Sequence, residues 1–170
     1  AGCQLVATGM RQGNTVISPI PAAMLVSAIA NGGTLMKPYV IDSVQSTEGS
    51  VIEQYESENY GTLMSASESS QLTKMMKAVV EEGTGYKLSG KNYSVAGKTG
   101  TAEKLPRSAH NYLVSFCGFA PADDPQLLVY VAIDTPNLPG KEQAHSTFAT
   151  EVFQKIMTEA LPYLNVFPDT

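Results

Sequence analysis

The stretch "YSVAGKTGTAEK" (residues 93–104) opens the block that decides the fold. Two further β-rich runs follow it, "NYLVSFCGFAP" (residues 111–121) and "QLLVYVAIDTP" (residues 126–136). The links between the runs are short, and the second, Ala-Asp-Asp-Pro, has the composition of a turn. Short links join antiparallel neighbours, whereas parallel strands need a long crossover. The sequence therefore predicts a three-strand antiparallel meander.

Helical signals precede this block. Ser18 followed by Pro19 is a helix cap with proline at the first helical position, and Asn-Gly-Gly (residues 31–33) is a stop signal. Nearly every residue between them is apolar or small, so we expect this helix to be buried on most sides. A second helix is predicted to begin after Ser65, whose spacing from Glu68 is that of a capping box. The apolar face of this second helix, which ends near Gly83, consists of Leu72, Met75, Met76, Val79 and Val80.

A third helix is predicted to close the chain. Pro162 marks its end, and its apolar face consists of Ala149, Val152, Phe153, Ile156, Met157 and Ala160. Between the first two helices, "KPYVIDSVQSTEGSVIEQYE" (residues 37–56) predicts two short strands joined by a Glu-Gly turn, as a surface hairpin. The order helix, hairpin, helix, three strands, helix predicts an α+β fold in which an antiparallel sheet packs against helices.

Composition narrows the function classes. The chain has 170 residues with 43% hydrophobic and 16% charged content, which fits one globular domain. Its net charge of -5 and the lack of any lysine or arginine run argue against a nucleic-acid partner. Cys3, Cys117, His110 and His145 have no ligand spacing, so we expect neither a metal site nor a cofactor.

The triplet Gly97, Lys98, Thr99 has two chemical interpretations. A phosphate-binding loop would need a glycine where Asn92 stands and a helix after the triplet, and the sequence provides neither. On a strand, Lys98 would instead supply a cation, while Thr99 and Thr101 would supply hydroxyl groups that suit a substrate carboxylate. Strict alternation places Lys98 and Thr99 on opposite faces, so a shared site needs an edge strand or a local twist. A plain strand with a solvated lysine is the alternative.

Several stretches of the sequence also resemble segments of a known protein family. Lys-Thr-Gly (residues 98–100) resembles the motif shared by penicillin-binding proteins and serine β-lactamases. The longer "GKTGTAE" is more similar to the transpeptidases among them. Three further segments resemble the neighbouring segments of class B transpeptidases and occur in the family's order. They are "RQGNTVISPIPAAMLVSAIANGGTLMKPYV", "SFCGFAPADDPQLLVYVAIDTP" and "EQAHSTFATEVFQKIMTEALPYL". Residues 1–170 thus resemble the C-terminal portion of that transpeptidase domain.

The resemblance implies an acyl-serine enzyme that attacks the D-alanyl-D-alanine end of a peptidoglycan stem peptide and also binds β-lactams. Lys98 would help proton transfer and attract the substrate carboxylate, and Thr99 and Thr101 would hydrogen-bond it. The Thr101 backbone N–H would donate to the oxyanion. Gly100 would let the substrate lie close, and Glu103 would sit near the acyl pocket.

Two catalytic motifs of the family are not found in this chain. No serine stands three residues before a lysine, so the Ser-x-x-Lys motif is missing. Ser57 and Asn59 match Ser-x-Asn formally, but they follow the segment that the family places after that motif. We therefore expect the N-terminal half of the domain, with the nucleophile, to lie outside this chain, and the chain alone to be inactive.

The resemblance also predicts where the parent protein works. It would act at the extracytoplasmic face of the bacterial membrane, held by an N-terminal anchor outside this chain. An uncovered sheet edge or apolar face would favour self-association of the fragment. The alternatives are a non-enzymatic β-lactam sensor domain, or a D,D-carboxypeptidase or β-lactamase.

Overall fold

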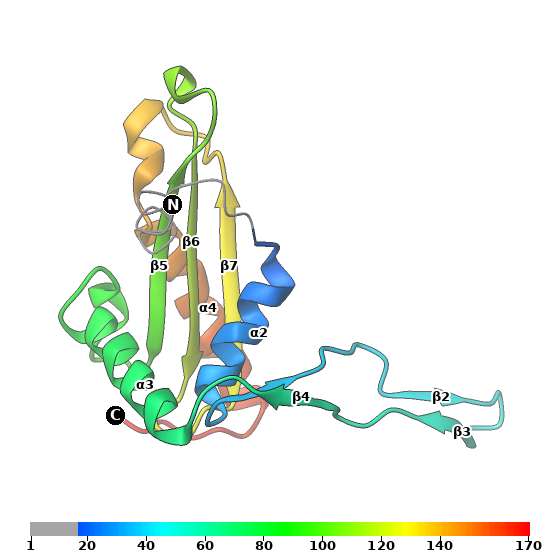
Figure 1. Cartoon of the computed structure of the whole chain (residues 1–170). Coiled ribbons are helices and arrows are strands. Elements are labelled where there is room, and N and C mark those ends of the chain that lie inside the picture. The colour runs from blue at the N-terminus through cyan, green and yellow to red at the C-terminus, as the bar shows by residue number, and fades with distance from the viewer. Residues whose placement is uncertain (1–16) are drawn as a thin grey trace, which may run out of the picture.

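The structure is a computed structural model that describes residues 17–170 (Figure 1). Its centre is a sheet with the order β5-β6-β7, in which both pairings are antiparallel. The strands are β5 (Ala96–Glu103), β6 (Tyr112–Ala120) and β7 (Leu127–Asp134). This confirms the predicted meander and the α+β fold class.

Three helices surround this sheet. They are α2 (Pro19–Ala30), α3 (Ala66–Glu81) and α4 (Thr147–Tyr163), close to their predicted bounds. Helix α4 packs on one face of β6 and β7, α2 packs on the other face, and α3 lies beside β5 (Figure 1). Three short 3-10 helices lie in the connections: η1 (Tyr86–Leu88), η2 (Arg107–Ala109) and η3 (Gly140–Ala144).

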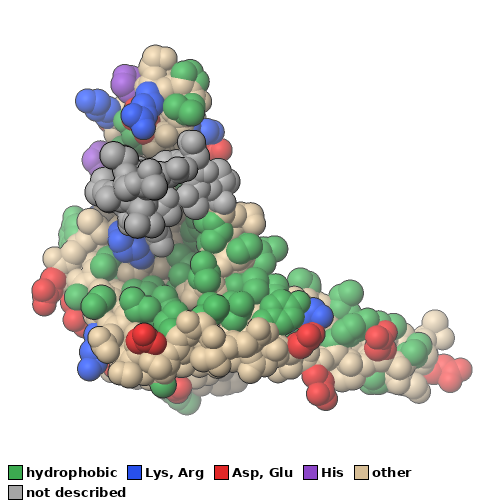
Figure 2. Space-filling view, in the orientation of Figure 1, with side chains coloured by type: hydrophobic (Ala, Val, Ile, Leu, Met, Phe, Trp, Pro, Cys, Tyr) green, Lys and Arg blue, Asp and Glu red, His purple; other side chains and the backbone are tan. Residues whose placement is uncertain are grey.

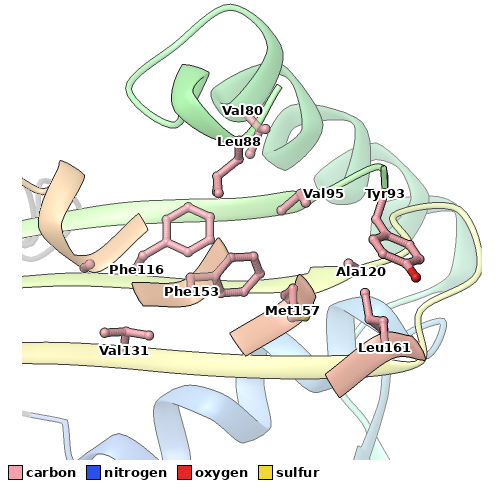
Figure 3. Close-up of a cluster of buried hydrophobic side chains, with 11 residues drawn as sticks. Val80, Leu88, Tyr93, Val95, Phe116, Ala120, Val131, Phe153, Met157 and Leu161 are labelled. Atoms are coloured by element: carbon pink, nitrogen blue, oxygen red, sulfur yellow. The ribbon is translucent and has the colours of Figure 1, made fainter. Parts of the chain in front are cut away.

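The main core lies between the sheet and α4, and Phe116 is at its centre (Figure 3). The Phe116 ring meets the ring of Phe153 edge to face, with centroids 4.7 Å apart and planes at 71°. Beneath it, Gly97 and Gly118 face each other across β5 and β6. A Cβ atom built on Gly97 would lie 2.3 Å from Phe116 Cζ, and one on Gly118 2.7 Å from Cε1. Both glycines are therefore needed to make room for the ring.

The capping box predicted for α3 is confirmed. The Ser65 hydroxyl accepts from the Glu68 backbone N–H at 3.3 Å, and the Glu68 carboxylate accepts from the Ser65 backbone N–H at 2.8 Å. The hydrogen bonds that the Ser65 backbone N–H and hydroxyl donate to the carboxylate lower the pKa of Glu68, because they favour its charged form. Of the predicted apolar face, Met76 and Val80 are buried.

The prediction that α2 is buried on most sides is wrong for the described residues. Ala28 is its one fully buried residue, while Ile20 and Leu25 are 64% and 45% exposed. The inner side packs through Val26, Ile29 and Ala30 against a second cluster around Phe119. Ile20 and Leu25 belong to neither of the two hydrophobic clusters of the described residues, so composition alone overestimated the burial of this helix.

The predicted apolar face of α4 also needs a correction. Val152 and Ile156 are 39% and 38% exposed. The buried side chains are Ala149, Thr150, Phe153, Met157 and Leu161. Four of them recur at intervals of four residues, so the buried stripe is narrower than the predicted one. Pro162 lies within the last turn of the helix, one residue before its end.

A long two-stranded ribbon leaves the body between α2 and α3, and we call residues 34–62 the arm (Figure 1). Its outer part, β2 (Ser43–Gln45) with β3 (Val51–Gln54), is the predicted surface hairpin. Its inner part, β1 (Thr34–Met36) with β4 (Asn59–Thr62), was not predicted. Gly33 starts the arm with a φ of +101°, where a Cβ atom would lie 2.0 Å from the Met64 carbonyl oxygen.

Within residues 17–170, no helix combines the length and apolar character needed to cross a membrane. Cys117 is buried in β6, and Cys3 lies outside the described residues.

The contact between Phe116 and Gly97 gives a test of the core. We expect Gly97→Ala to lower the free energy of unfolding by about 1–3 kcal/mol, because the added methyl overpacks the ring. In a Phe116→Leu background the same substitution should cost clearly less. Urea unfolding of the four proteins in this double-mutant cycle measures the coupling. Additive effects of the two substitutions would contradict the contact.

Candidate functional site

The candidate site is the part of β5 from Lys98 to Glu103, six of its eight residues. All eight residues of β5 pair with β6 without a bulge, from Ala96 opposite Phe119 to Glu103 opposite Tyr112. Among the described residues, β6 is the only strand neighbour of β5. The outer edge of β5 therefore offers main-chain groups along which an extended peptide can align.

Lys98 and Thr99 project to opposite faces of the sheet, as alternation requires. The Lys98 side chain contacts the backbone of the next residue, because its Nζ donates to the Thr99 carbonyl at 2.8 Å. Thr99 is buried, and its Oγ1 lies 2.7 Å from Thr84 Oγ1, in a hydrogen bond between the two hydroxyl groups. Thr84 follows α3, so this bond ties the middle of β5 to the end of that helix.

Thr101 is the exposed hydroxyl of the site. It lies opposite Val114, on the same side of β5 as Thr99. When Thr84 donates to Thr99, the Thr99 hydroxyl keeps its own hydrogen for another acceptor. Of the two threonines on this face, Thr101 is the exposed one and Thr99 the buried one.

Gly100 lies opposite Ser115 on β6. A Cβ atom on Gly100 would lie 2.5 Å from Ser115 Oγ and 3.9 Å from Ser115 Cβ. Glycine at this position therefore accommodates a cross-strand neighbour, and the close substrate approach expected from the sequence stays a prediction. Sequence reasoning missed Thr84 and Ser115, because both contacts depend on packing and register that no motif specifies.

Glu103 ends β5, where its carboxylate joins a small polar cluster. Its Oε1 accepts from the Tyr112 hydroxyl at 3.2 Å and lies 3.3 Å from His110 Nδ1. Partial burial, together with this carboxylate, raises the pKa of the Tyr112 hydroxyl. Beside it, Lys104 binds Asp134 at 2.6 Å, and this contact lowers the pKa of the Asp134 carboxyl. Glu103 thus helps to hold the β5–β6 loop.

The other candidates lie away from this strand. Ser57 and Asn59 belong to the arm, where Asn59 Oδ1 accepts from the Gly61 backbone N–H at 2.7 Å. Asp123 binds Lys77 at 2.9 Å in the β6–β7 turn. No three His, Cys, Asp or Glu side chains gather to hold a metal ion in the described part of the chain.

Comparison with known proteins identifies the class of this fold and site. Residues 4–158 match the family model "Penicillin binding protein transpeptidase domain". The chain therefore belongs to this family, as the motifs had indicated.

Individual relatives agree with this assignment. The chain is 39% identical over 165 residues to stage V sporulation protein D of Bacillus subtilis, covering 95% of this chain and 25% of that protein. The transpeptidase domain of Burkholderia pseudomallei penicillin-binding protein 3 is 27% identical, with a TM-score of 0.75 and coverage of 95% and 47%. An imipenem acyl-enzyme complex of penicillin-binding protein A from Mycobacterium tuberculosis is 25% identical, with a TM-score of 0.75 and coverage of 88% and 32%. The chain thus spans about a quarter of the curated relative and less than half of either structure.

The Gly100 contact generates a prediction. Gly100→Ala should lower the free energy of unfolding by about 1 kcal/mol, because the new methyl displaces the Ser115 hydroxyl. In a Ser115→Ala background the next atom stands at an ordinary 3.9 Å, so the same change should be nearly neutral. Chemical denaturation checks this, and an equal loss in both backgrounds would refute the contact.

Proposed function

We propose that this chain is the C-terminal part of the catalytic domain of a peptidoglycan D,D-transpeptidase. The parent enzyme would transfer an acyl group from the D-alanyl-D-alanine end of a stem peptide to a neighbouring amine. The observation that supports this most directly is the placement of Lys98 to Thr101 on an edge strand whose base is fixed by Phe116. Such a strand can align a peptide through its backbone while its side chains meet the peptide's terminal carboxylate.

The roles follow from the chemistry of acyl transfer. A serine supplied by the rest of the domain would attack the carbonyl carbon of the penultimate D-alanine, and the terminal D-alanine would leave as an amine that takes up a proton. Lys98 would attract the terminal carboxylate and assist the proton transfer. Thr99 and Thr101 would hydrogen-bond the carboxylate, the Thr101 N–H would donate to the oxyanion, and Glu103 would border the acyl pocket.

The same groups would bind a β-lactam, whose carboxylate takes the place of the peptide's. One relative of known structure is an imipenem acyl-enzyme complex, which supports this extension to the present chain. The acyl-enzyme would again form on the serine outside this chain. A β-lactam sensor would share this binding step but would transfer no acyl group, whereas a D,D-carboxypeptidase or β-lactamase would pass it to water.

We also propose a cellular location for the parent protein. Stem peptides are crosslinked outside the cytoplasmic membrane, so we place the domain there, held by an anchor outside this chain. The exposed apolar side of α2, with Ile20 and Leu25, is a suitable contact surface for the upstream half of the domain. Self-association of the isolated chain through the same surface stays a prediction, and sedimentation at high concentration measures it.

The isolated chain should form no covalent penicillin adduct, because it has no Ser-x-x-Lys nucleophile. Intact-mass spectrometry after incubation with benzylpenicillin checks this, with a complete penicillin-binding protein as positive control. A stoichiometric adduct on this chain would overturn the assignment of the nucleophile to the missing half.

In the full-length protein, Lys98→Ala should slow acylation by a fluorescent penicillin at least about a hundredfold, because a charge-assisted contact and a proton-transfer partner are both lost. Product analysis with a donor peptide and an acceptor amine separates transfer from hydrolysis. A crosslinked product supports the transpeptidase, a shortened peptide supports the carboxypeptidase, and an acyl-enzyme that never turns over supports the sensor.

The hydroxyl groups can be tested separately from the lysine. Thr101→Val should slow acylation about tenfold to a hundredfold, the usual cost of a lost hydrogen bond to a carboxylate, while Thr101→Ser should retain the rate. Thr99→Val and Thr99→Ser are compared in the same way. Thr84→Val is measured beside them, because Thr84 shares a hydrogen bond with Thr99. Full activity in both valine variants would exclude these hydroxyl groups from carboxylate binding.

A further inference from the structure

The arm, residues 34–62, plays no part in the site described above. Figure 1 shows it extending away from the sheet and the helices, with β2 and β3 at its far end. Its four strands form two-stranded sheets, β1 with β4 and β2 with β3. Each of these strands therefore has one edge without a strand neighbour among the described residues.

The arm is a preformed ribbon along its length. Near the base, the Lys37 backbone N–H donates to the Glu58 carbonyl at 2.8 Å, and the Lys37 ammonium binds the Glu58 carboxylate at 2.7 Å. Further out, Gln54 Nε2 donates to the Asp42 backbone carbonyl at 3.0 Å. At the tip, the Ser46 hydroxyl accepts from the Ser50 backbone N–H at 3.2 Å. A partner would thus meet an ordered surface and would not have to fold it.

The arm exposes many large apolar side chains (Figure 2). Val40 is fully exposed and Ile52 is 68% exposed. The complete set is Tyr39, Val40, Ile41, Val44, Val51, Ile52, Tyr55 and Tyr60. An isolated two-stranded ribbon is marginal in water, and a projecting element with this much exposed apolar surface is typical of an interaction site.

The arm also carries most of the chain's excess negative charge. Residues 37–60 contain one lysine against five carboxylates, a net charge of -4. The other residues of the chain contain ten basic and eleven acidic side chains, so they are nearly neutral. Glu53 lies within β3 and directly follows the exposed Val51 and Ile52, and Glu56 lies two residues after the strand ends.

We propose that the arm is a docking site for a partner protein that presents an extended segment with alternating apolar and basic side chains. The segment adds as a strand along the open edge of β3, where its backbone pairs with the ribbon. Its apolar side chains cover Val51 and Ile52, where the register of β3 shifts, and its lysines or arginines meet Glu53 within the strand. Strand addition of this kind gains affinity from main-chain hydrogen bonds and specificity from the side chains.

The charge of the arm selects this occupant over two others. The arm of a second copy would bring a net charge of -4 against the same charge, and charged side chains on an exposed edge strand are a known protection against such pairing. An anionic lipid surface would repel the arm for the same reason. A basic partner is attracted by the same negative charges that repel a second copy of the chain and an anionic lipid surface.

The test uses the complete chain and a labelled peptide in which lysine and valine alternate. We expect fluorescence anisotropy to detect binding, and NMR shift changes to fall on residues 34–62 while the signals of β5 to β7 remain unchanged. Glu48→Lys, Glu53→Lys and Glu56→Lys together should weaken binding at least about tenfold. Glu58 is left intact in this variant, because it pairs with Lys37.

The matched control carries Glu82→Lys, Glu142→Lys and Glu159→Lys, three exposed positions outside the arm. It has the same net charge as the arm variant, so a general charge effect would weaken binding equally in both and would overturn the proposal. Failure of the wild-type chain to bind the peptide, or shift changes outside the arm, would also overturn it. So would equally tight binding of a peptide with alternating glutamate and valine.

Two further measurements separate the other occupants. Sedimentation that shows self-association of the wild-type chain but not of the arm variant would make a second copy the partner. Binding to phosphatidylglycerol vesicles that the arm variant loses would make a lipid surface the partner. Either result would replace the proposed basic strand.

Discussion

The placement of the Phe116 ring over Gly97 and Gly118 is the constraint on which the rest of the structure depends. The ring fills the space that two facing glycines leave open, and it meets Phe153 of α4 edge to face. Such an aromatic pair contributes about 0.5–1.5 kcal/mol beyond the area that it buries. Because Gly97 directly precedes Lys98, the same contact that joins the sheet to α4 also fixes the base of the candidate site.

From this base, the strand divides its side chains between structure and chemistry. Thr99 turns inward to Thr84, and Gly100 leaves room for Ser115, so these two residues hold β5 against its neighbours. Lys98 and Thr101 are exposed beside the edge of β5 that has no strand neighbour within residues 17–170. A rigid strand with a few exposed polar groups suits a site that must hold a peptide and a developing charge in a fixed geometry. In the proposed function this chain would supply one wall of the site, and the remainder of the domain would supply the nucleophile.

Local patterns in the sequence were enough to predict the meander, three helices and the outer hairpin. The capping box of Ser65 and Glu68 and the β-rich runs are local signals. They depend on residues close together in the sequence and can therefore be read without knowing the tertiary contacts. The contacts of Thr84 and Ser115 could not be predicted, since they depend on cross-strand register and on where α3 ends. Burial of α2 was predicted wrongly, because apolar composition does not show whether another part of the chain packs against each side of the helix. The inner strands β1 and β4 are too short for a periodic signal.

A crystal structure of the full-length protein acylated by a β-lactam would show whether β5 is the substrate-facing wall of an acyl-transfer site. We expect the adduct to lie along the outer edge of β5, with its carboxylate within hydrogen-bonding distance of the Thr99 or Thr101 hydroxyl and near Lys98. An adduct whose carboxylate is bound elsewhere, with β5 uninvolved, would contradict it.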